Sequence, residues 1–319
     1  LRTASADASF RRYLRLDAAD GHSRVVMDAP PPAEDVRPFV AAAALLSEAG
    51  LKVPAVLEAD LAQGFLLLQD LGDRLLLAEL DEHEAAGRTQ QTHERMLEAI
   101  DALVAMQLRT STAGLPAYDG ALLHRELELF PVWCVQRDRG LEWTPRQAEQ
   151  WTQAKDRLVA SALAQPSVFV HRDFMPRNLM LDAATGGLAL LDFQDAVRGP
   201  ITYDLASLLR DAFISWDEER EIDWAVRYWE RARKAGLPVD DDFGEHWRQL
   251  EWMGLQRHLK VLGIFCRLKH RDGKPRYHAD LPRFFAYAHK VAARYNGLGP
   301  LAALLEQAAG TERREGYTF

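Results

Sequence analysis

Residues 167–193 read SVFVHRDFMPRNLMLDAATGGLALLDF and form a β-rich island in an otherwise helical half of the chain. The apolar run Ser167–Val170 predicts one strand, and two further short apolar runs flank a turn-forming stretch, which predicts a hairpin. Asn178 and Asp192 are equidistant from Thr185 in that turn. Pairing of the two strands is therefore expected to bring these two side chains to neighbouring positions.

An amide oxygen beside a carboxylate at the open end of a hairpin indicates a site for Mg²⁺, which prefers oxygen ligands. Asp173 precedes Asn178 by five residues and is expected to face the same point, where it could accept a proton from a substrate hydroxyl. An isolated Asp–Asn pair beside a turn is more often structural, because both residues favour turns. Here His171, Asp173, Asn178 and Asp192 coincide around a strand and a hairpin, and the pattern HRDxxxxN followed by DF is typical of kinase active sites.

Two residues near this constellation have alternative interpretations. His171 either takes part in the chemistry or orders the backbone of the loop that contains it. Asp195, three residues after Asp192, is either a second carboxylate beside the metal and substrate or a solvated turn residue.

The N-terminal part of the chain predicts short strands and one helix, and the rest predicts long helices, so we expect an α+β fold. Thr144 and Gln147 predict a capping box at the start of one of these helices. The expected strands are Phe10–Leu16, Arg24–Met27, Val53–Leu57 and Phe65–Gln69; the expected helices are Pro38–Ala49, 145–163, Glu218–Ala235, Trp247–Leu268 and Pro282–Tyr295.

The chain resembles, over nearly its whole length, the aminoglycoside-phosphotransferase-like branch of the protein-kinase-like superfamily. The resemblance is most specific over Val170–Phe213, which is similar to the group of sugar kinases that phosphorylate N-acetylmuramate and N-acetylglucosamine at the anomeric hydroxyl in peptidoglycan recycling. It implies a two-lobed protein-kinase-like fold with ATP and Mg²⁺ as cofactors. The small β-rich N-lobe would span residues 1–72, with a hinge at 69–72, and the large, mainly helical C-lobe would span residues 73–319.

The same resemblance assigns roles to individual residues. Asp173 would be the catalytic base, and Asn178 and Asp192 would bind Mg²⁺. Gln69 and Leu71 would lie in the hinge that reads adenine through its backbone. Asp204 would brace the catalytic loop.

The N-terminal part departs from the kinase pattern in two ways. It has no Gly-rich loop; the turn that would face the phosphates runs from Ser5 to Ser9, where backbone and hydroxyl groups could donate. The strand at Arg24–Ala29 has no Lys for the α- and β-phosphates. Arg11 or Arg12 could supply that positive charge, and a surface role for either remains the alternative.

Substrate contacts are expected from residues in the second half of the chain. An N-acetylated sugar needs an apolar wall and hydrogen-bond partners, and a substrate carboxylate is best met by Arg. For each candidate taken singly, the alternative is a core aromatic residue or a solvated helical charge. The candidates are Phe130, Trp133, Asp195, Arg210, Asp211, Trp216, Arg257 and His258, with Asp204, Ser207 and Asp211 on one face of a helix that starts near Tyr203.

Only eight residues separate Asp195 from Asp204, which leaves no room for the activation segment that docks a peptide in protein kinases. A small hydroxylated substrate is therefore expected. Two alternatives remain: a kinase of another small alcohol, such as an aminoglycoside, choline or homoserine, and a non-catalytic nucleotide-binding pseudokinase, which the missing Lys would suit.

The composition limits the partners. The 319 residues include 39 Lys and Arg against 47 Asp and Glu, for a net charge of −8, which argues against bulk binding of nucleic acid or of an anionic membrane. The region 257–276 nevertheless holds seven Lys and Arg against one Asp. Two cysteines are too few for a disulfide framework, and no apolar run approaches the 18–20 residues of a membrane span. We expect a cytoplasmic protein without an obligate protein partner.

Overall fold

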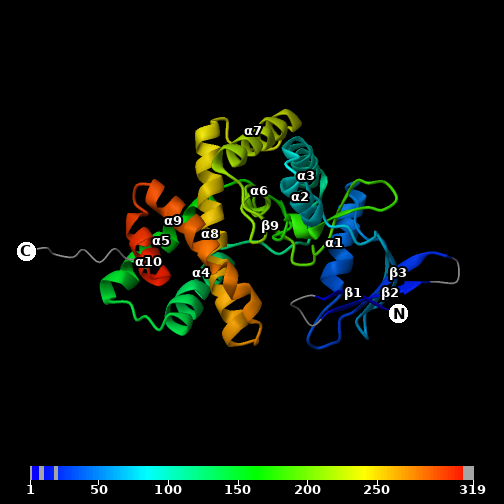
Figure 1. Cartoon of the computed structure of the whole chain (residues 1–319), viewed down its shortest axis with the longest axis horizontal. Coiled ribbons are helices and arrows are strands. Elements are labelled where there is room, and N and C mark those ends of the chain that lie inside the picture. Colours follow the sequence, from blue (N-terminus) through cyan, green and yellow to red (C-terminus); the bar gives the residue numbers. More distant parts are fainter. Residues whose placement is uncertain (1, 7–10, 18–20, 312–319) are drawn as a thin grey trace, which may run out of the picture. The chain divides into compact units, whose positions relative to one another are not determined.

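The computed structural model describes residues 2–6, 11–17 and 21–311 (Figure 1). Its strands are β1 (Arg2–Ala6), β2 (Arg12–Asp17), β3 (Ser23–Asp28), β4 (Val56–Asp60), β5 (Phe65–Gln69), β6 (Ser167–Val170), β7 (Leu179–Leu181), β8 (Leu188–Leu190) and β9 (Val197–Pro200). Its α-helices are α1 (Arg37–Glu48), α2 (Leu76–Ala85), α3 (Thr89–Arg109), α4 (Gly120–Leu127), α5 (Pro145–Leu163), α6 (Tyr203–Leu209), α7 (Glu218–Ala235), α8 (Phe243–His270), α9 (Leu281–Arg294) and α10 (Gly299–Ala309). A π-helix spans Phe130–Asp138, and 3₁₀ turns span Pro176–Asn178 and Pro275–Asp280.

The described chain divides into two compact units, each built from segments far apart in the sequence. The first comprises Leu1–Pro116, Val168–Arg198 and Asp217–Val239, and the second comprises Ala117–Ser167, Gly199–Trp216 and Asp240–Phe319. The expected α+β fold with an N-terminal sheet and a largely helical remainder is confirmed. The lobe boundary at residue 72 stays a prediction.

The N-terminal sheet of the first unit is antiparallel, with the strand order β1-β2-β3-β5-β4 (Figure 1). On β5 buried residues alternate with more exposed ones, as expected for a strand in a sheet with one covered face. Leu66 and Leu68 on β5 are at most 2% exposed, and Met27 on β3 is 1% exposed. Phe39 and Leu46 of α1 are also buried. The apolar face of the sheet and that of α1 thus contribute to the core of the first unit.

Local capping chemistry explains where several helices begin and end. The capping box of α5 is formed: the Thr144 hydroxyl accepts the Gln147 N–H at 3.3 Å, and the Gln147 carboxamide accepts the Thr144 N–H at 2.9 Å. The Asp217 carboxylate accepts the Arg220 N–H at 2.9 Å at the start of α7, and Gly236 ends that helix in the left-handed region with φ 85°. These ends follow from residues that the sequence shows directly.

The hairpin β7–β8 is fixed on two sides within the first unit. The Leu190 N–H donates to the Lys52 carbonyl at 2.9 Å, and the Leu181 N–H donates to the Arg74 carbonyl at 2.9 Å. Directly after the hairpin, the rings of Phe193 and Phe39 lie 4.7 Å apart between centroids. The hairpin is therefore tied to the segment between β3 and β4 and to the segment that follows β5.

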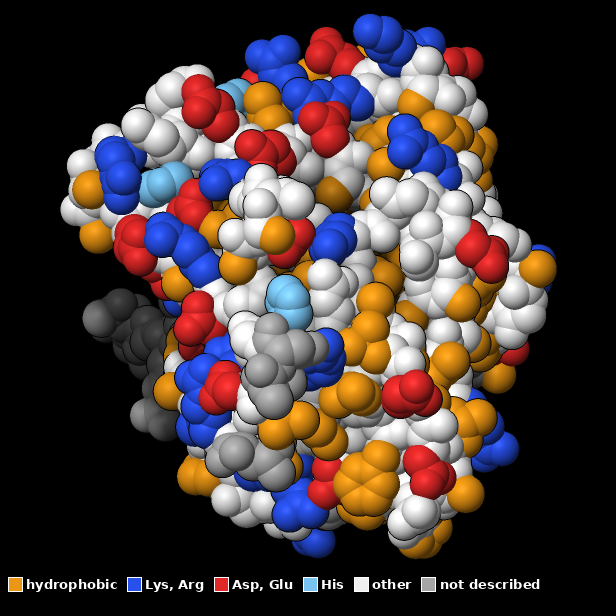
Figure 2. Space-filling model, turned by 90° about the vertical axis from the view of Figure 1, so that its right-hand side faces the viewer, with side chains coloured by type: hydrophobic (Ala, Val, Ile, Leu, Met, Phe, Trp, Pro, Cys, Tyr) orange, Lys and Arg blue, Asp and Glu red, His pale blue; other side chains and the backbone are white. Residues whose placement is uncertain are grey.

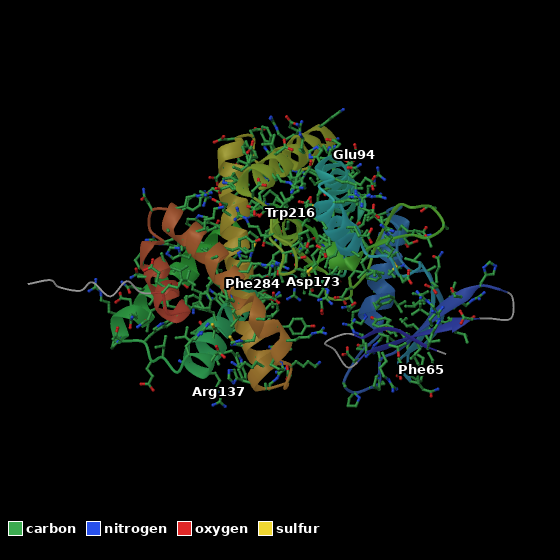
Figure 3. All side chains as sticks on the ribbon, viewed as in Figure 1. Phe65, Glu94, Arg137, Asp173, Trp216 and Phe284 are labelled. Atoms are coloured by element: carbon green, nitrogen blue, oxygen red, sulfur yellow. The ribbon has the colours of Figure 1, made fainter. Side chains whose placement is uncertain are left out.

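Helix α8 is the central helix of the second unit, where it packs on α4, α5, α6, α9 and the π-helix. Gly263 permits its close approach to the π-helix, because a Cβ there would lie 2.4 Å from the Leu129 carbonyl carbon. Figure 3 labels Phe284 of α9, which is fully buried beside α8 and stacks edge-on with Phe265 at 5.5 Å.

Several expected boundaries were wrong. The strand predicted at Val53–Leu57 begins at Val56, because Pro54 has no N–H for the ladder. The hairpin strands span only three residues each, and helix α2 was missed because it has no side-chain cap. Helix α6 ends at Leu209, so Asp211 does not continue its face, and the whole helix is buried rather than one side of it.

No helix in the described ranges is long and apolar enough to cross a lipid bilayer. On the face shown in Figure 2, Lys and Arg side chains alternate with Asp and Glu side chains rather than gathering in one patch of a single sign.

Candidate active site

The loop after β6 presents Asp173 (Figure 3) and holds it through backbone contacts. The Asp173 N–H donates to Nδ1 of His171 at 3.3 Å, and the His171 ring is fully buried against Phe174 and Phe193. Arg172 lies between them with φ 75°, a left-handed conformation that non-glycine residues adopt at some energetic cost. His171 thus orders the loop, while the Asp173 carboxyl group stays half-buried.

Asn178 is oriented by the same loop. Its side-chain Nδ2 donates to the Asp173 carbonyl at 2.9 Å, and its backbone N–H donates to the Met175 carbonyl at 2.8 Å. Because the amide nitrogen is used inward, the amide oxygen Oδ1 is the atom that remains to bind a ligand.

The strands next to Asn178 and Asp192 pair in a register that differs from the expected one. Leu179 pairs with Leu190, so the hairpin is centred between residues 184 and 185 rather than on Thr185, and Asn178 is opposite Leu191. The Leu191 N–H donates to the Asn178 carbonyl at 2.9 Å. The expected register was therefore wrong by one residue. Leu181 pairs with Leu188, so the turn is one residue shorter than a turn centred on Thr185 would be.

The Asp192 carboxylate is a suitable metal ligand. Asp192 has φ 62°, and its side chain is 31% exposed, so the group turns out of the ladder and keeps access to solvent. Gln194 Nε2 donates to its Oδ1 at 2.9 Å. The Asp192 carboxylate and the Asn178 amide oxygen are of the ligand type that Mg²⁺ takes, an ion that uses few protein ligands and completes its shell with phosphate and water. Binding of the ion by these two residues stays a prediction. Asp195 is exposed, and its role stays a prediction.

Arg11 lies between two carboxylates, those of Asp192 and Glu34. Its Nη2 is 3.6 Å from Asp192 Oδ1, and its Nε is 3.8 Å from Glu34 Oε2. Its side chain is 11% exposed. Arg12, the other candidate, forms an ion pair with Asp28 across β2 and β3. Of the two, Arg11 is thus the one beside the proposed metal ligand.

The sequence analysis missed Glu34. This residue follows three prolines and has no motif around it, so only the folded chain reveals that it pairs with Arg11. Arg15 was missed as well. It lies on β2 two residues after Tyr13 and on the same face of the strand, and this alternation could have indicated from the sequence which face Arg15 occupies.

The hinge expected at residues 69–72 is held by Arg15. Arg15 Nε lies 2.6 Å from Asp70 Oδ2, and Arg15 Nη2 donates to the Gly72 carbonyl at 2.6 Å. Although burial alone raises the pKa of Asp70, hydrogen bonds from Arg15 and Ser23 keep that pKa below its ordinary value. The Leu71 carbonyl accepts the Ala183 N–H at 3.0 Å.

Gln69 ends β5, where its N–H donates to the Ala55 carbonyl at 2.9 Å. For the phosphate-facing turn, Ser5 pairs with Tyr13 through the backbone of β1, and Ser9 lies outside the described residues. The nucleotide-binding roles of Gln69, Leu71, Ser5 and Ser9 stay predictions.

The aromatic substrate candidates differ in exposure. Phe130 is 0% exposed and packs in the core of the second unit against Trp151, Trp143 and Phe285. Trp133, on the same π-helix, is half-buried. Trp216 (Figure 3) is 7% exposed. Their substrate contacts stay predictions, and the packing of Phe130 favours a core role for it.

The polar candidates of the second unit are all buried. Arg210 Nη2 lies 3.0 Å from Glu251 Oε1, and the Asp211 carboxylate accepts the adjacent Ala212 N–H at 2.5 Å. His258 Nε2 lies 3.3 Å from the Arg210 carbonyl. Arg257, one residue earlier on α8, is 4% exposed.

A second cluster of possible ligand atoms lies at the end of the π-helix. One ligand atom each from Asp138, Cys266 and His278 lies within 4.8 Å of the others. The sequence analysis did not predict this cluster. Lys269 Nζ, however, lies 2.8 Å from Asp138 Oδ1 and 3.0 Å from His278 Nε2. The ammonium group therefore supplies the positive charge that this carboxylate needs.

We expect His171 to make stability depend on pH. Burial lowers the pKa of His171 to about 4, against about 6.5 in the unfolded chain. Above pH ~6.5 the ring is neutral in both the folded and the unfolded chain, so His171 costs the fold nothing. As the pH falls towards 4 the unfolded chain gains a proton that the folded chain does not, and the free energy of unfolding falls by up to about 3 kcal/mol. Urea unfolding between pH 7 and 4.5 should show a smaller loss for His171→Asn than for the wild type. An equal loss would show that His171 titrates normally, since His246 and the other histidines are common to both chains.

Solved structures with a similar fold include kinases of small alcohols. A microcompartment-associated aminopropanol kinase matches with a TM-score of 0.63 at 14% identity, covering 93% of each chain. Choline kinase LicA from Streptococcus pneumoniae matches with a TM-score of 0.61 at 12% identity, covering 89% of this chain and 90% of that chain. At these identities the likeness shows the fold. The family match and the curated relatives that follow show that the chain is an ATP-dependent small-molecule kinase.

Residues 1–251 match the phosphotransferase enzyme family, and the chain belongs to that family. It is 50% identical over 307 residues to the N-acetylmuramate/N-acetylglucosamine kinase of Pseudomonas putida, covering 96% of this chain and 88% of the relative. It is 48% identical over 318 residues to the kinase of the same name from Neisseria meningitidis serogroup B, covering 99% of this chain and 93% of the relative.

Proposed function

We propose that this chain transfers the γ-phosphoryl group of ATP to the anomeric hydroxyl of N-acetylmuramate and N-acetylglucosamine, in the recycling of cytoplasmic peptidoglycan fragments. The observation that carries the proposal is the grouping of Asp173, Asn178 and Asp192 around one loop and hairpin, in a chain about half identical to kinases named for these two sugars. The roles below are part of this proposal.

Asp173 acts on the acceptor. Its half-buried carboxylate accepts a hydrogen bond from the sugar hydroxyl and takes the proton as the oxygen attacks the γ-phosphorus. The side chain of His171 accepts from the Asp173 N–H and that of Asn178 donates to the Asp173 carbonyl, so the loop is held and little reorganisation is needed in the transition state.

Asn178 and Asp192 would hold Mg²⁺, which when bound would neutralise charge on the phosphate oxygens. Arg11 donates to the phosphates in the role that a strand lysine has in other kinases. Glu34 and Asp192 keep its guanidinium group in place. This position of Arg11 supports turnover over the pseudokinase alternative, for which the missing Lys was the motive.

The direct test is phosphate transfer by the purified protein. With ATP and MgCl₂, we expect ³¹P NMR to show a sugar 1-phosphate from both N-acetylmuramate and N-acetylglucosamine, coupled to the anomeric proton. Choline, homoserine and an aminoglycoside serve as competing acceptors in the same assay. Transfer only to one of these, or to another hydroxyl of the sugar, would overturn the assignment.

A further inference from the structure

The π-helix of the second unit ends at Asp138, next to Arg137, which Figure 3 labels. The Asp138 side chain is only 2% exposed. The Cys266 thiol of α8 is buried beside it. Three side chains with basic nitrogens reach the carboxylate, two from the end of α8 and one from the 3₁₀ turn that follows: Lys269, His270 and His278. The whole cluster lies within the second unit.

The ammonium group of Lys269 marks the point where two lone pairs converge. Its Nζ lies 2.8 Å from Asp138 Oδ1 and 3.0 Å from His278 Nε2. An ammonium group can only donate, so the His278 nitrogen accepts and directs its lone pair towards Nζ. A carboxylate oxygen and an imidazole nitrogen aimed at one point are ligands that a metal ion takes. The Lys269 side chain is partly exposed, so it can turn out to solvent.

Cys266 supplies a third ligand atom at this point. Its sulfur lies within 4.8 Å of one ligand atom each of Asp138 and His278. Zinc bonds of about 2.0–2.3 Å in a tetrahedron place the ligand atoms about 3.3–3.8 Å from one another. His278 Nε2 is 2.9 Å from Asp138 Oδ1, so these two atoms must separate by a few tenths of an ångström. His278 lies on a short, partly exposed turn that can make this adjustment.

We propose that Asp138, Cys266 and His278 form a zinc site in the second unit. In this site Zn²⁺ takes the position of the Lys269 ammonium group, and water completes the tetrahedron. A mixed set of oxygen, sulfur and nitrogen ligands suits Zn²⁺, whereas Mg²⁺ prefers oxygen alone. His270 Nε2, 2.7 Å from Asp138 Oδ1, donates to the bound carboxylate and orients it.

Binding changes the protonation of one ligand and links three elements. A hydrogen bond with Cys134 and burial raise the pKa of the Cys266 thiol, so the metal-free protein carries the S–H form. Zinc is bound by the thiolate, and the displaced proton passes to solvent. The bound ion connects the π-helix, α8 and the 3₁₀ turn at 275–280. Its role is therefore structural, and it stabilises the folded second unit.

Cobalt tests the thiolate ligand directly. Co²⁺ accepts the same kinds of ligand as Zn²⁺, and a cobalt–thiolate bond absorbs in the near ultraviolet by charge transfer. We expect the metal-free wild type to develop this band with a stoichiometric amount of Co²⁺ and to lose it when Zn²⁺ displaces the cobalt. The proposed Mg²⁺ ligands Asn178 and Asp192 contain no sulfur, so cobalt bound there would not give the band.

Two cysteine variants show which thiol binds. Cys266→Ser should abolish the cobalt band, whereas Cys134→Ser, at the neighbouring buried thiol, should retain it. Zinc should raise the Tm of the wild type and of Cys134→Ser but leave that of Cys266→Ser unchanged. His278→Gln changes a partly exposed side chain and should weaken zinc binding at least about 10-fold, measured by competition with a chelator.

Lys269→Met tests whether the ion and the ammonium group share one position. The substitution removes the competing charge and keeps a side chain of similar length, so zinc binding should tighten by about 10-fold. Lys290→Met is the matched control. It makes the same change at an exposed position of α9 and should leave the zinc affinity unaltered.

The outcomes are separate from those of the proposed function, because none of these measurements uses kinase activity. A wild type without the cobalt band, or a band that survives in Cys266→Ser, would overturn the zinc site. Equal zinc affinity of Lys269→Met and the wild type would overturn the replacement of the ammonium group by the ion.

Discussion

Asp173→Asn should lower kcat on N-acetylglucosamine by about 10²- to 10⁴-fold, because an amide cannot take the proton of the attacking hydroxyl. The KM for ATP should change little. Asp→Asn replaces one carboxylate oxygen by an NH₂ group and preserves the shape of the side chain. Among such substitutions in this chain, we expect this one to cause the largest loss of kcat.

The structure makes this variant a clean test of chemistry. The contacts that hold the loop use the backbone of Asp173: its N–H donates to His171, and its carbonyl accepts from Asn178 Nδ2. Neither bond involves the carboxyl group. The variant should therefore keep the loop, the orientation of the Asn178 oxygen and the Tm of the protein.

Single-turnover and steady-state rates check the prediction, with Asp81→Asn as the control. That substitution makes the same chemical change at an exposed position of α2 and should leave kcat unaltered. If Asp173→Asn retained more than about a tenth of the wild-type kcat, Asp173 would not be the base.

The sequence predicted those features that depend on neighbours along the chain. The capping box at Thr144 and the left-handed end at Gly236 are local, so their residue types identify them before folding. The strand of Ser167–Val170 and the following hairpin are likewise local. The register of that hairpin was off by one, because turn geometry, and not the count of residues from its centre, decides which residues pair.

Features made by distant segments could not be predicted in the same way. Arg11 meets Asp192 and Glu34 only after the N-terminal sheet and the hairpin have folded into one unit. The sequence showed that a strand lysine was missing but left the choice between Arg11 and Arg12 open. Arg257 could be named as a candidate from its charge, but its burial is a property of the packed helices.

Asp192→Asn should lower kcat/KM by about 10²- to 10³-fold through a different cause, the loss of negative charge from the proposed metal ligands. Asn is the appropriate replacement because Asp192 has φ 62°, a conformation that Asn tolerates and most other residues do not. The amide can still accept from Gln194, so the local fold should persist.

The dependence on Mg²⁺ distinguishes this variant from Asp173→Asn. With Asp192→Asn, the Mg²⁺ concentration for half-maximal rate should rise, and part of the lost rate should return at high Mg²⁺, because a weakened site can be filled by mass action. Asp173→Asn should show the wild-type Mg²⁺ dependence at a uniformly lower rate. If the Mg²⁺ dependence changed with Asp173→Asn and stayed at the wild-type value with Asp192→Asn, the two roles would have to be exchanged. Asp173 would then bind the metal, and Asp192 would take the proton.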